Sequence, residues 1–294
     1  MTHTEKPSLK RQRRRPVKRG IFILAALLAW TLSPLTTDVQ ADNWNAFAPL
    51  KGELAISGGT AHIPVMKTLS TEIMKAAPAV RISIAGGGSG LGIKQVGEGI
   101  VTIGNSGRSP KPNEIKKYGL VLHRWAVDGV AVAVHPDNPV RALTSDQLRA
   151  IYAGTLANWK ELGGPDRAIN LYTRDASSGT RSVFWKKALG KGEIHPGANF
   201  VKSNGAMKSA LSGDPYGIGY LSVGHLDASV AGLAIDGTAP TLANVKSGAY
   251  PIARGLYSNT KGEATGLAKA FIDALYSPRG QEIIAAKGFI PVKG

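Results

Sequence analysis

The chain has 294 residues, 43% of them hydrophobic, with 36 Lys and Arg against 20 Asp and Glu and a formal net charge of +16. This composition is typical of a globular protein and excludes a disordered or fibrous chain. Cysteine is absent, so disulfide bonds, thiolate catalysis and cysteine-ligated metals are excluded as well. The histidines lack metal-ligand spacing. We therefore predict neither a metal nor a cofactor.

The N-terminus has the pattern of an export signal. Eight Lys and Arg residues lie between positions 6 and 19, directly before the apolar run Ile21 to Trp30, and Val39-Gln40-Ala41 is a small-x-small cleavage signature. We predict a signal peptide at 1–41, cleaved near Ala41, and a periplasmic product with 28 basic and 18 acidic side chains, a charge of +10. A nucleic-acid arm and an uncleaved membrane anchor are the alternatives for this segment.

Strands and helices alternate along the rest of the chain, which predicts an α/β fold. Predicted strands are 53–57, 80–84, 100–103, 127–134, 169–173, 217–221 and 250–257. Predicted helices are 63–76, 91–98, 145–152, 181–189 and 266–287. Because ligands bind beyond the carboxyl ends of strands in such sheets, the loops at these ends are the candidate site.

Four of these loops combine glycines with hydroxyl side chains: 58–60, 86–90, 104–108 and 174–180. The backbone N–H groups at a helix N-terminus are unpaired and lie at the positive end of the dipole, so such loops favour anions. Arg174 and Arg108 add guanidinium groups that can bind an oxyanion through two hydrogen bonds. The alternative for each loop is an ordinary helix cap. The loop 86–90 lacks the Gly-Lys-Ser/Thr of a Walker motif and an ordered dinucleotide fingerprint.

Several short motifs occur together in one order. They are Ser57-Gly58-Gly59-Thr60, Gly87-Gly88-Ser89-Gly90 with Ile93-Lys94, Ile103 to Arg108, Asp128-Gly129-Val130, Asn158-Trp159, Arg174 with Ser178-Gly179-Thr180-Arg181, Gly217-Ile218-Gly219-Tyr220 and Gly288-Phe289-Ile290-Pro291. In this order the chain resembles the periplasmic phosphate-binding proteins of ABC transporters over essentially its whole length after the signal. The resemblance implies the two-lobed fold of a type II periplasmic binding protein, with a hinge and a ligand cleft between the lobes.

We expect a first lobe from 42–127 and 228–294 and a second lobe from 128–227, because 127–134 and 223–233 look like crossing segments. The resemblance implies that phosphate contacts a set of hydroxyl, amide and guanidinium groups on both lobes. This set is Thr60, Ala61, Ser89, Arg108, Arg174, Ser178, Gly179 and Thr180. Gly107 is a departure, since many members carry a hydroxyl or a carboxylate there. A carboxylate can accept the proton of hydrogen phosphate and repel sulfate, with Asp175 or Asp128 as possible substitutes.

The expected function is capture of inorganic phosphate and its delivery to an ABC permease in the inner membrane. Phosphate sensing and binding of another oxyanion such as sulfate or molybdate are alternatives. An extracytoplasmic phosphatase or serine hydrolase is a further one, but a Gly-x-Ser-x-Gly elbow is missing and we predict no enzyme and no catalytic residues. The few aromatic residues form no stripe with basic residues, so we expect no nucleic-acid partner. We expect a monomer.

Overall fold

The computed structural model of the chain describes residues 44–293. The predicted signal peptide at 1–41 and its cleavage near Ala41 lie outside the described residues. The strands form one sheet in the order β2-β1-β3-β11-β4-β8-β6-β7, with β12 and β9 each paired to β4, and a separate pair formed by β10 and β5. The predicted α/β class is confirmed.

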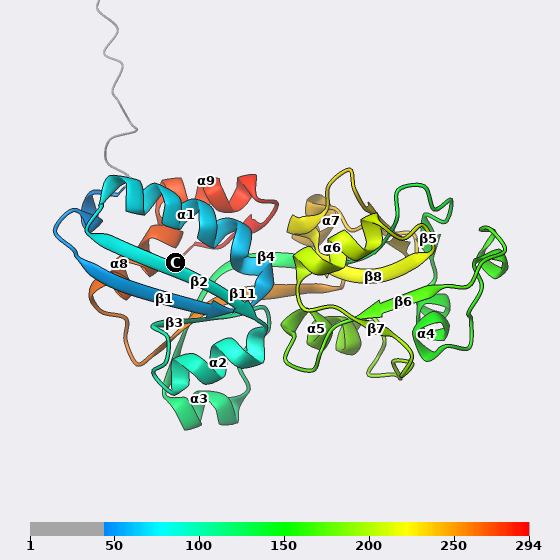
Figure 1. Cartoon of the computed structure of the whole chain (residues 1–294), viewed down its shortest axis with the longest axis horizontal. Helices are drawn as coiled ribbons and strands as arrows, with labels where there is room; N and C mark the ends of the chain where they lie inside the picture. Colours follow the sequence, from blue (N-terminus) through cyan, green and yellow to red (C-terminus); the bar gives the residue numbers. More distant parts are fainter. Residues whose placement is uncertain (1–43, 294) are drawn as a thin grey trace, which may run out of the picture. The chain divides into compact units, whose positions relative to one another are not determined.

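The first part of the sheet is the βαβ unit predicted from the sequence. Strand β1 (Gly52–Gly58) pairs in parallel with β2 (Val80–Gly87) and with β3 (Ile103–Ser106). Helix α1 (Ile63–Ala76) buries an apolar stripe spaced three or four residues apart, and α2 (Ser89–Gly97) follows β2. Figure 1 shows α1 and α2 on opposite sides of these strands.

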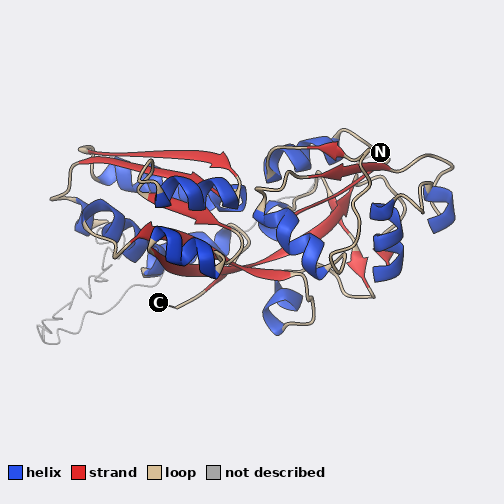
Figure 2. Cartoon of the chain, turned by 90° about the horizontal axis from the view of Figure 1, so that it is seen from below, coloured by secondary structure: helices blue, strands red, loops and turns tan. Residues whose placement is uncertain are grey.

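One long strand connects the two halves of the sheet. Strand β4 (Leu120–Val134) pairs with β11 (Ala253–Lys261) along its first part and with β8 (Gly217–Ser222) from Val130 onward. It starts seven residues earlier than the predicted strand at 127–134, because the alternating segment before residue 127 is paired with β11. Figures 1 and 2 show β4 and β11 running together between the two halves.

The second half of the sheet is built around β8 and β6 (Asn170–Thr173), which are parallel. Helices α4 (Ser145–Ala153) and α5 (Gly179–Lys187) pack on one face, and α6 (Asn204–Ser212) packs on the other. The remaining elements are α3 (Pro112–Tyr118), β5 (Ala142–Leu143), β7 (Asn199–Phe200), β9 (Ala231–Gly232), β10 (Ala234–Ile235), α7 (Leu242–Ser247) and the closing elements α8 (Gly266–Tyr276), α9 (Pro278–Ala286) and β12 (Ile290–Pro291).

The predicted closing helix at 266–287 was wrong, since the chain forms two helices there. Helix α8 ends before Ser277, and α9 begins at Pro278. Proline has no N–H for the helical ladder and is tolerated in the first turn of a helix, so it starts a new helix instead of continuing the old one. The hydroxyl of Ser277 caps α9 by accepting a hydrogen bond from the Gly280 N–H at 3.0 Å.

Two large hydrophobic clusters form the core. The first combines side chains from residues 44–103 with Trp125, Ala126 and the C-terminal helices. The second runs from Val130 to Ile252. It includes Leu233, Val245 and Tyr250, so side chains of the segment from 233 to 252 pack with the second core, and the expected boundary at residue 228 stays a prediction. The division into two lobes itself stays a prediction.

Glycines bring α2 close to the strands beneath it. A Cβ added at Gly92 of α2 would lie 2.6 Å from the Asn105 carbonyl oxygen and 2.8 Å from the Gly58 Cα. These neighbours are backbone atoms of β3 and β1, which cannot rotate away. The close approach fixes the N-terminus of α2 at the carboxyl ends of the strands.

We expect Gly92→Ala to lower the free energy of unfolding by about 1–3 kcal/mol through overpacking. Gly205→Ala is the matched control, because the nearest atom to its added Cβ is 3.7 Å away and alanine favours a helix by up to about 1 kcal/mol. Urea denaturation measures both. Equal effects of the two substitutions would contradict this account of the packing.

A buried histidine lies in the first core. The ring of His62 is inaccessible to solvent and packs edge-on against Trp125, with 5.5 Å between the ring centroids. Burial, helped by the charge of Arg254, lowers the pKa of His62 from 6.5 to about 3. The side chain is therefore neutral at physiological pH.

This pKa predicts a loss of stability in mild acid. The unfolded chain binds a proton on His62 below about pH 6.5, whereas the folded protein binds it only near a pKa of about 3. Protonation then favours the unfolded chain, and His62 lowers the free energy of unfolding by up to roughly 1.4 kcal/mol per pH unit in this window. Urea titrations at stepped pH should show a shallower dependence in His62→Gln. A ring resonance of His62 that titrates in the folded protein between about pH 7 and 5 would refute the prediction.

Candidate functional site

Three strand-to-helix loops from the two halves of the sheet meet at one pocket. Seven of the eight predicted residues line it together with four others, and the space not filled by protein atoms is about 170 Å³. The pocket is small and suits an ion rather than a drug-sized ligand. Its lining is Gly59, Thr60, Ala61, Gly88, Ser89, Gly107, Arg174, Ser178, Gly179, Thr180 and Arg254.

Helix N-termini supply the backbone of the pocket. Ser89 begins α2, Gly179 and Thr180 begin α5, and Thr60 begins the short turn that leads into α1. The first N–H groups of a helix have no partner inside the helix and carry the positive end of its dipole. In α5 the Ser178 hydroxyl accepts the third of these N–H groups, that of Arg181, at 3.1 Å. The N–H groups of Gly179 and Thr180 remain for a ligand.

The hydroxyl groups of the pocket are arranged as donors. The Thr60 oxygen accepts two hydrogen bonds from Asn204, from its backbone N–H at 3.2 Å and from its side-chain amide at 3.0 Å. The Ser89 oxygen accepts the N–H of Gly107 at 2.9 Å. A hydroxyl whose lone pairs are occupied can act only through its own hydrogen. Because both lone pairs of Thr60 are occupied, its hydroxyl offers a proton to whatever fills the pocket.

Arg174 brings a buried positive charge with unused donors. Its side chain is 1% exposed, and its Nη2 donates to the Lys202 carbonyl at 3.1 Å. Its Nε and Nη1 have no hydrogen-bond partner among the described residues. Burial lowers the pKa of this guanidinium from its usual value, but an arginine keeps its charge at any physiological pH. Buried donors without partners are costly, and an anion would satisfy them.

Arg254 is a second cation that the sequence analysis missed. It extends from β11 to the pocket and forms a buried ion pair with Asp128, with 2.7 Å between Nη2 and Oδ2. Its Nη1 donates to the Thr180 hydroxyl at 2.9 Å and to the Gly107 carbonyl at 3.2 Å. The only sequence signal was an arginine inside a buried strand with an aspartate in a neighbouring strand.

The structure does not bring Arg108 to the pocket, which corrects the predicted second cation. Its guanidinium forms two hydrogen bonds of 2.8 Å with the Glu114 carboxylate at the start of α3. Arg254, and not Arg108, is the second arginine that lines the pocket. A Cβ at Gly107 would lie 2.8 Å from Arg254 Nη1, so the glycine that departs from the family pattern leaves room for this guanidinium.

Within residues 44–293, no carboxylate lines the pocket. Asp175 accepts a hydrogen bond from the backbone N–H of Ser177 at 2.8 Å. Asp128 accepts from Arg254 and, at 2.8 Å, from the Ser222 hydroxyl. Neither proposed substitute for a proton acceptor faces the ligand space. The described lining combines helix N–H groups, hydroxyls and two guanidinium groups.

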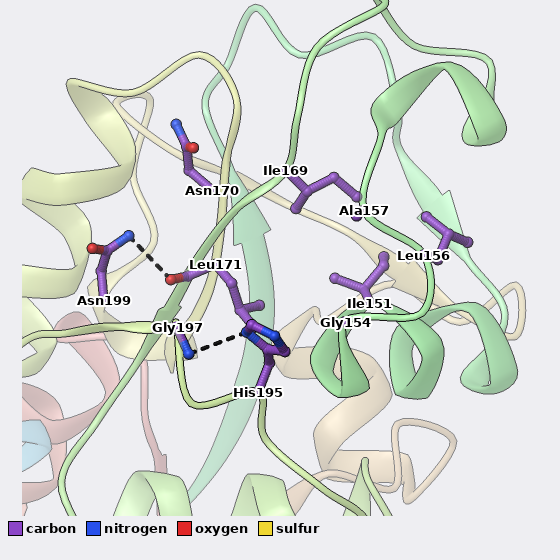
Figure 3. A pocket seen from close by; sticks show the side chains of 10 residues that line it. All are labelled: Ile151, Gly154, Leu156, Ala157, Ile169, Asn170, Leu171, His195, Gly197 and Asn199. Carbon is purple, nitrogen blue, oxygen red and sulfur yellow. Dashed lines mark hydrogen bonds between the residues drawn. The ribbon is translucent and has the colours of Figure 1, made fainter.

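A larger cavity lies in the second half of the sheet, with about 700 Å³ by the same measure. Figure 3 shows its lining, which combines apolar side chains with His195, Asn170 and Asn199. The His195 Nδ1 accepts the Gly197 N–H at 3.1 Å. Among the described residues, no Arg or Lys lines this cavity.

Comparisons with known proteins agree with this geometry. The profile of the PBP superfamily domain matches residues 45–279. The chain is 44% identical over 244 residues to the phosphate-binding protein PstS of Bacillus subtilis, covering 82% of this chain and 81% of the relative. Among solved structures it is similar to a phosphate ABC transporter substrate-binding protein from Clostridium perfringens with bound phosphate, at 36% identity and a TM-score of 0.78, over 82% of this chain and all of that one. An ABC-type phosphate transport receptor from Vibrio cholerae matches at 31% identity and a TM-score of 0.66, with the same coverage.

Proposed function

The chain belongs to the phosphate-binding proteins of the PBP superfamily, and we propose that it holds inorganic phosphate in the pocket between the α1, α2 and α5 N-termini. It is a substrate-binding protein that captures phosphate for an ABC transporter. The binding residues are Thr60, Ala61, Ser89, Arg174, Ser178, Gly179 and Thr180 from the predicted set, with Arg254 in place of Arg108.

The observation that carries this proposal is the buried guanidinium of Arg174 with its free Nε and Nη1. These unpaired guanidinium donors can bond to oxygens of a tetrahedral oxyanion, and charge-assisted bonds of this kind are stronger than neutral ones. The hydroxyls and helix N-termini around it supply donors for the remaining oxygens.

Capture follows from the way in which both halves of the sheet contribute to the pocket. Thr60 and Ser89 follow strands of the first half, and Arg174 and Ser178 follow β6 of the second. Two hydrogen bonds also connect the halves directly. The Ser177 hydroxyl donates to the Gly87 carbonyl at 2.9 Å, and the Ser177 backbone carbonyl accepts the Gly90 N–H at 2.9 Å. An anion between the halves accepts hydrogen bonds from both of them and neutralises the charge of Arg174. We infer two lobes that close on phosphate, with the second lobe extending to about residue 252, and a permease that recognises the closed form.

The place of action follows from the N-terminus. The proposed signal at 1–41 directs a monomeric product to the periplasm, where it delivers phosphate to a permease of the inner membrane. No helix among residues 44–293 is long and apolar enough to cross a membrane. The basic charge of the chain raises the local concentration of anions around the pocket.

Arg174→Ala should weaken phosphate binding by roughly 10- to 150-fold, because hydrogen bonds to a charged group contribute about 1.5–3 kcal/mol. Ser178→Ala should cost less, roughly 2- to 12-fold, since a neutral hydrogen bond contributes about 0.5–1.5 kcal/mol. Calorimetric titration of the mature protein with phosphate measures both.

Arg108→Ala is the matched control, because this arginine is paired with Glu114 outside the pocket. We expect its phosphate affinity to equal that of the unaltered protein. Circular dichroism and a thermal melt establish that each variant is folded. A loss in Arg108→Ala as large as that in Arg174→Ala would mean that the anion lies elsewhere.

Sulfate should compete with phosphate more than in a site that contains a proton acceptor. A pocket built to pair with a ligand O–H rejects an analogue without it by roughly 10⁴- to 10⁵-fold. With no carboxylate among the described lining residues, the rejection of sulfate should fall well short of this. Phosphate titrations with and without a large excess of sulfate measure it. An unchanged phosphate titration would reveal an acceptor, and Asp175→Asn would then test the nearest candidate.

A further inference from the structure

A buried chain of polar side chains runs behind the pocket and ends on two of its hydroxyls. Every member is at most 7% exposed. The Asn204 side chain donates to the Thr60 hydroxyl and accepts the backbone N–H of Ser222. The Ser222 hydroxyl donates to Asp128. Asp128 forms an ion pair with Arg254, and Arg254 donates to the Thr180 hydroxyl. In order, the chain is Thr60, Asn204, Ser222, Asp128, Arg254 and Thr180.

Asn204 has only one possible orientation in this chain. It is the first residue of α6 and is inaccessible to solvent. Its Oδ1 accepts the backbone N–H of Ser222 at 2.9 Å. Because a backbone N–H can only donate, the amide oxygen must face Ser222 and the amide nitrogen must face Thr60. The 3.0 Å contact is therefore a hydrogen bond from Nδ2 to the Thr60 oxygen.

This orientation decides what Thr60 can do. Its oxygen has two lone pairs, and Asn204 occupies both, one with the backbone N–H and one with the side-chain amide. The Thr60 hydrogen is left to bond into the pocket. Thr60 can then meet a bare anionic oxygen, but it cannot accept the proton of a P–O–H group.

We propose that Asn204 is a specificity-determining positioning residue, which makes Thr60 an obligatory donor and so favours oxyanion oxygens that carry no proton. This inference rests on the proposed function, since it concerns the same pocket. Asn204 does not touch the anion and acts only through Thr60. At the other end of the chain Arg254 Nη1 donates one hydrogen bond to the Thr180 hydroxyl at 2.9 Å, which occupies one of its two lone pairs.

Asn204→Asp tests the proposal, because it keeps the shape and the oxygen that faces Ser222 but replaces the donor that faces Thr60 with an acceptor. The Thr60 hydrogen then turns to the carboxylate, and a Thr60 lone pair faces the pocket. Hydrogen phosphate can donate its proton to this lone pair, whereas sulfate has none to donate. The added negative charge weakens both dianions alike. The ratio of sulfate to phosphate dissociation constants should rise by about tenfold, the equivalent of one hydrogen bond.

The measurement is calorimetry with phosphate and with sulfate at a slightly alkaline pH, where both anions carry two charges. Asn113→Asp, an exposed position on α3, makes the same chemical change away from the pocket and should leave the ratio unchanged. In a Thr60→Val background, Asn204→Asp should also leave it unchanged, since no hydroxyl remains to be turned. Thermal melts check the folding of every variant.

Asn204→Ala is the second variant, because it removes the donor to Thr60 without adding a carboxylate. It should shift the ratio in the same direction by a smaller factor. Equal weakening of both anions in the Asn204 variants would show a merely structural role and overturn the inference. An unchanged ratio in both variants would overturn it as well. Failure of the unaltered protein to bind either anion would instead reject the proposed function.

Discussion

The site depends on one unbalanced charge, the guanidinium of Arg174 held away from water with two of its donors unused. A buried cation is expensive unless it is paired. Arg254, in contrast, has its counterion within the protein in Asp128. The pocket thus contains one arginine that is neutralised by the chain and one that is left for the ligand. A bound anion would supply the negative charge that Arg174 lacks within the protein.

The hydroxyls around Arg174 are held in place by hydrogen bonds from other protein groups, and in Thr60 these occupy both lone pairs. Asn204, Gly107 and Arg254 each donate to a pocket hydroxyl, so the first layer of donors is set by a second layer behind it. This arrangement restricts rotation of the hydroxyls before a ligand arrives. Preorganised donors in a dry site act more strongly than the same groups would in water.

The sequence revealed the parts of the site that are local in the chain. Gly58 to Thr60, Gly88-Ser89 and Ser178 to Thr180 each combine a strand end, a glycine and a hydroxyl within a few residues, and the structure brings all three together. Arg254 could not be found in this way, because its partners Asp128 and Thr180 lie 126 and 74 residues away in the sequence. Arg108 was misplaced because its nearby partner, Glu114, captures it. Likewise the end of α8 was missed, since the apolar periodicity continues across Pro278 although the helix does not.

The strand order has a consequence for how the chain is made. Strand β11 lies between β3 and β4, although it follows β4 by more than a hundred residues. The sheet of the first half therefore has a gap until residues 253–261 have been synthesised, and the N-terminal βαβ unit cannot complete its core alone. Such non-local pairing slows folding. The first half of the sheet can therefore close only when nearly the whole chain is available, so the order of synthesis delays the burial of its core.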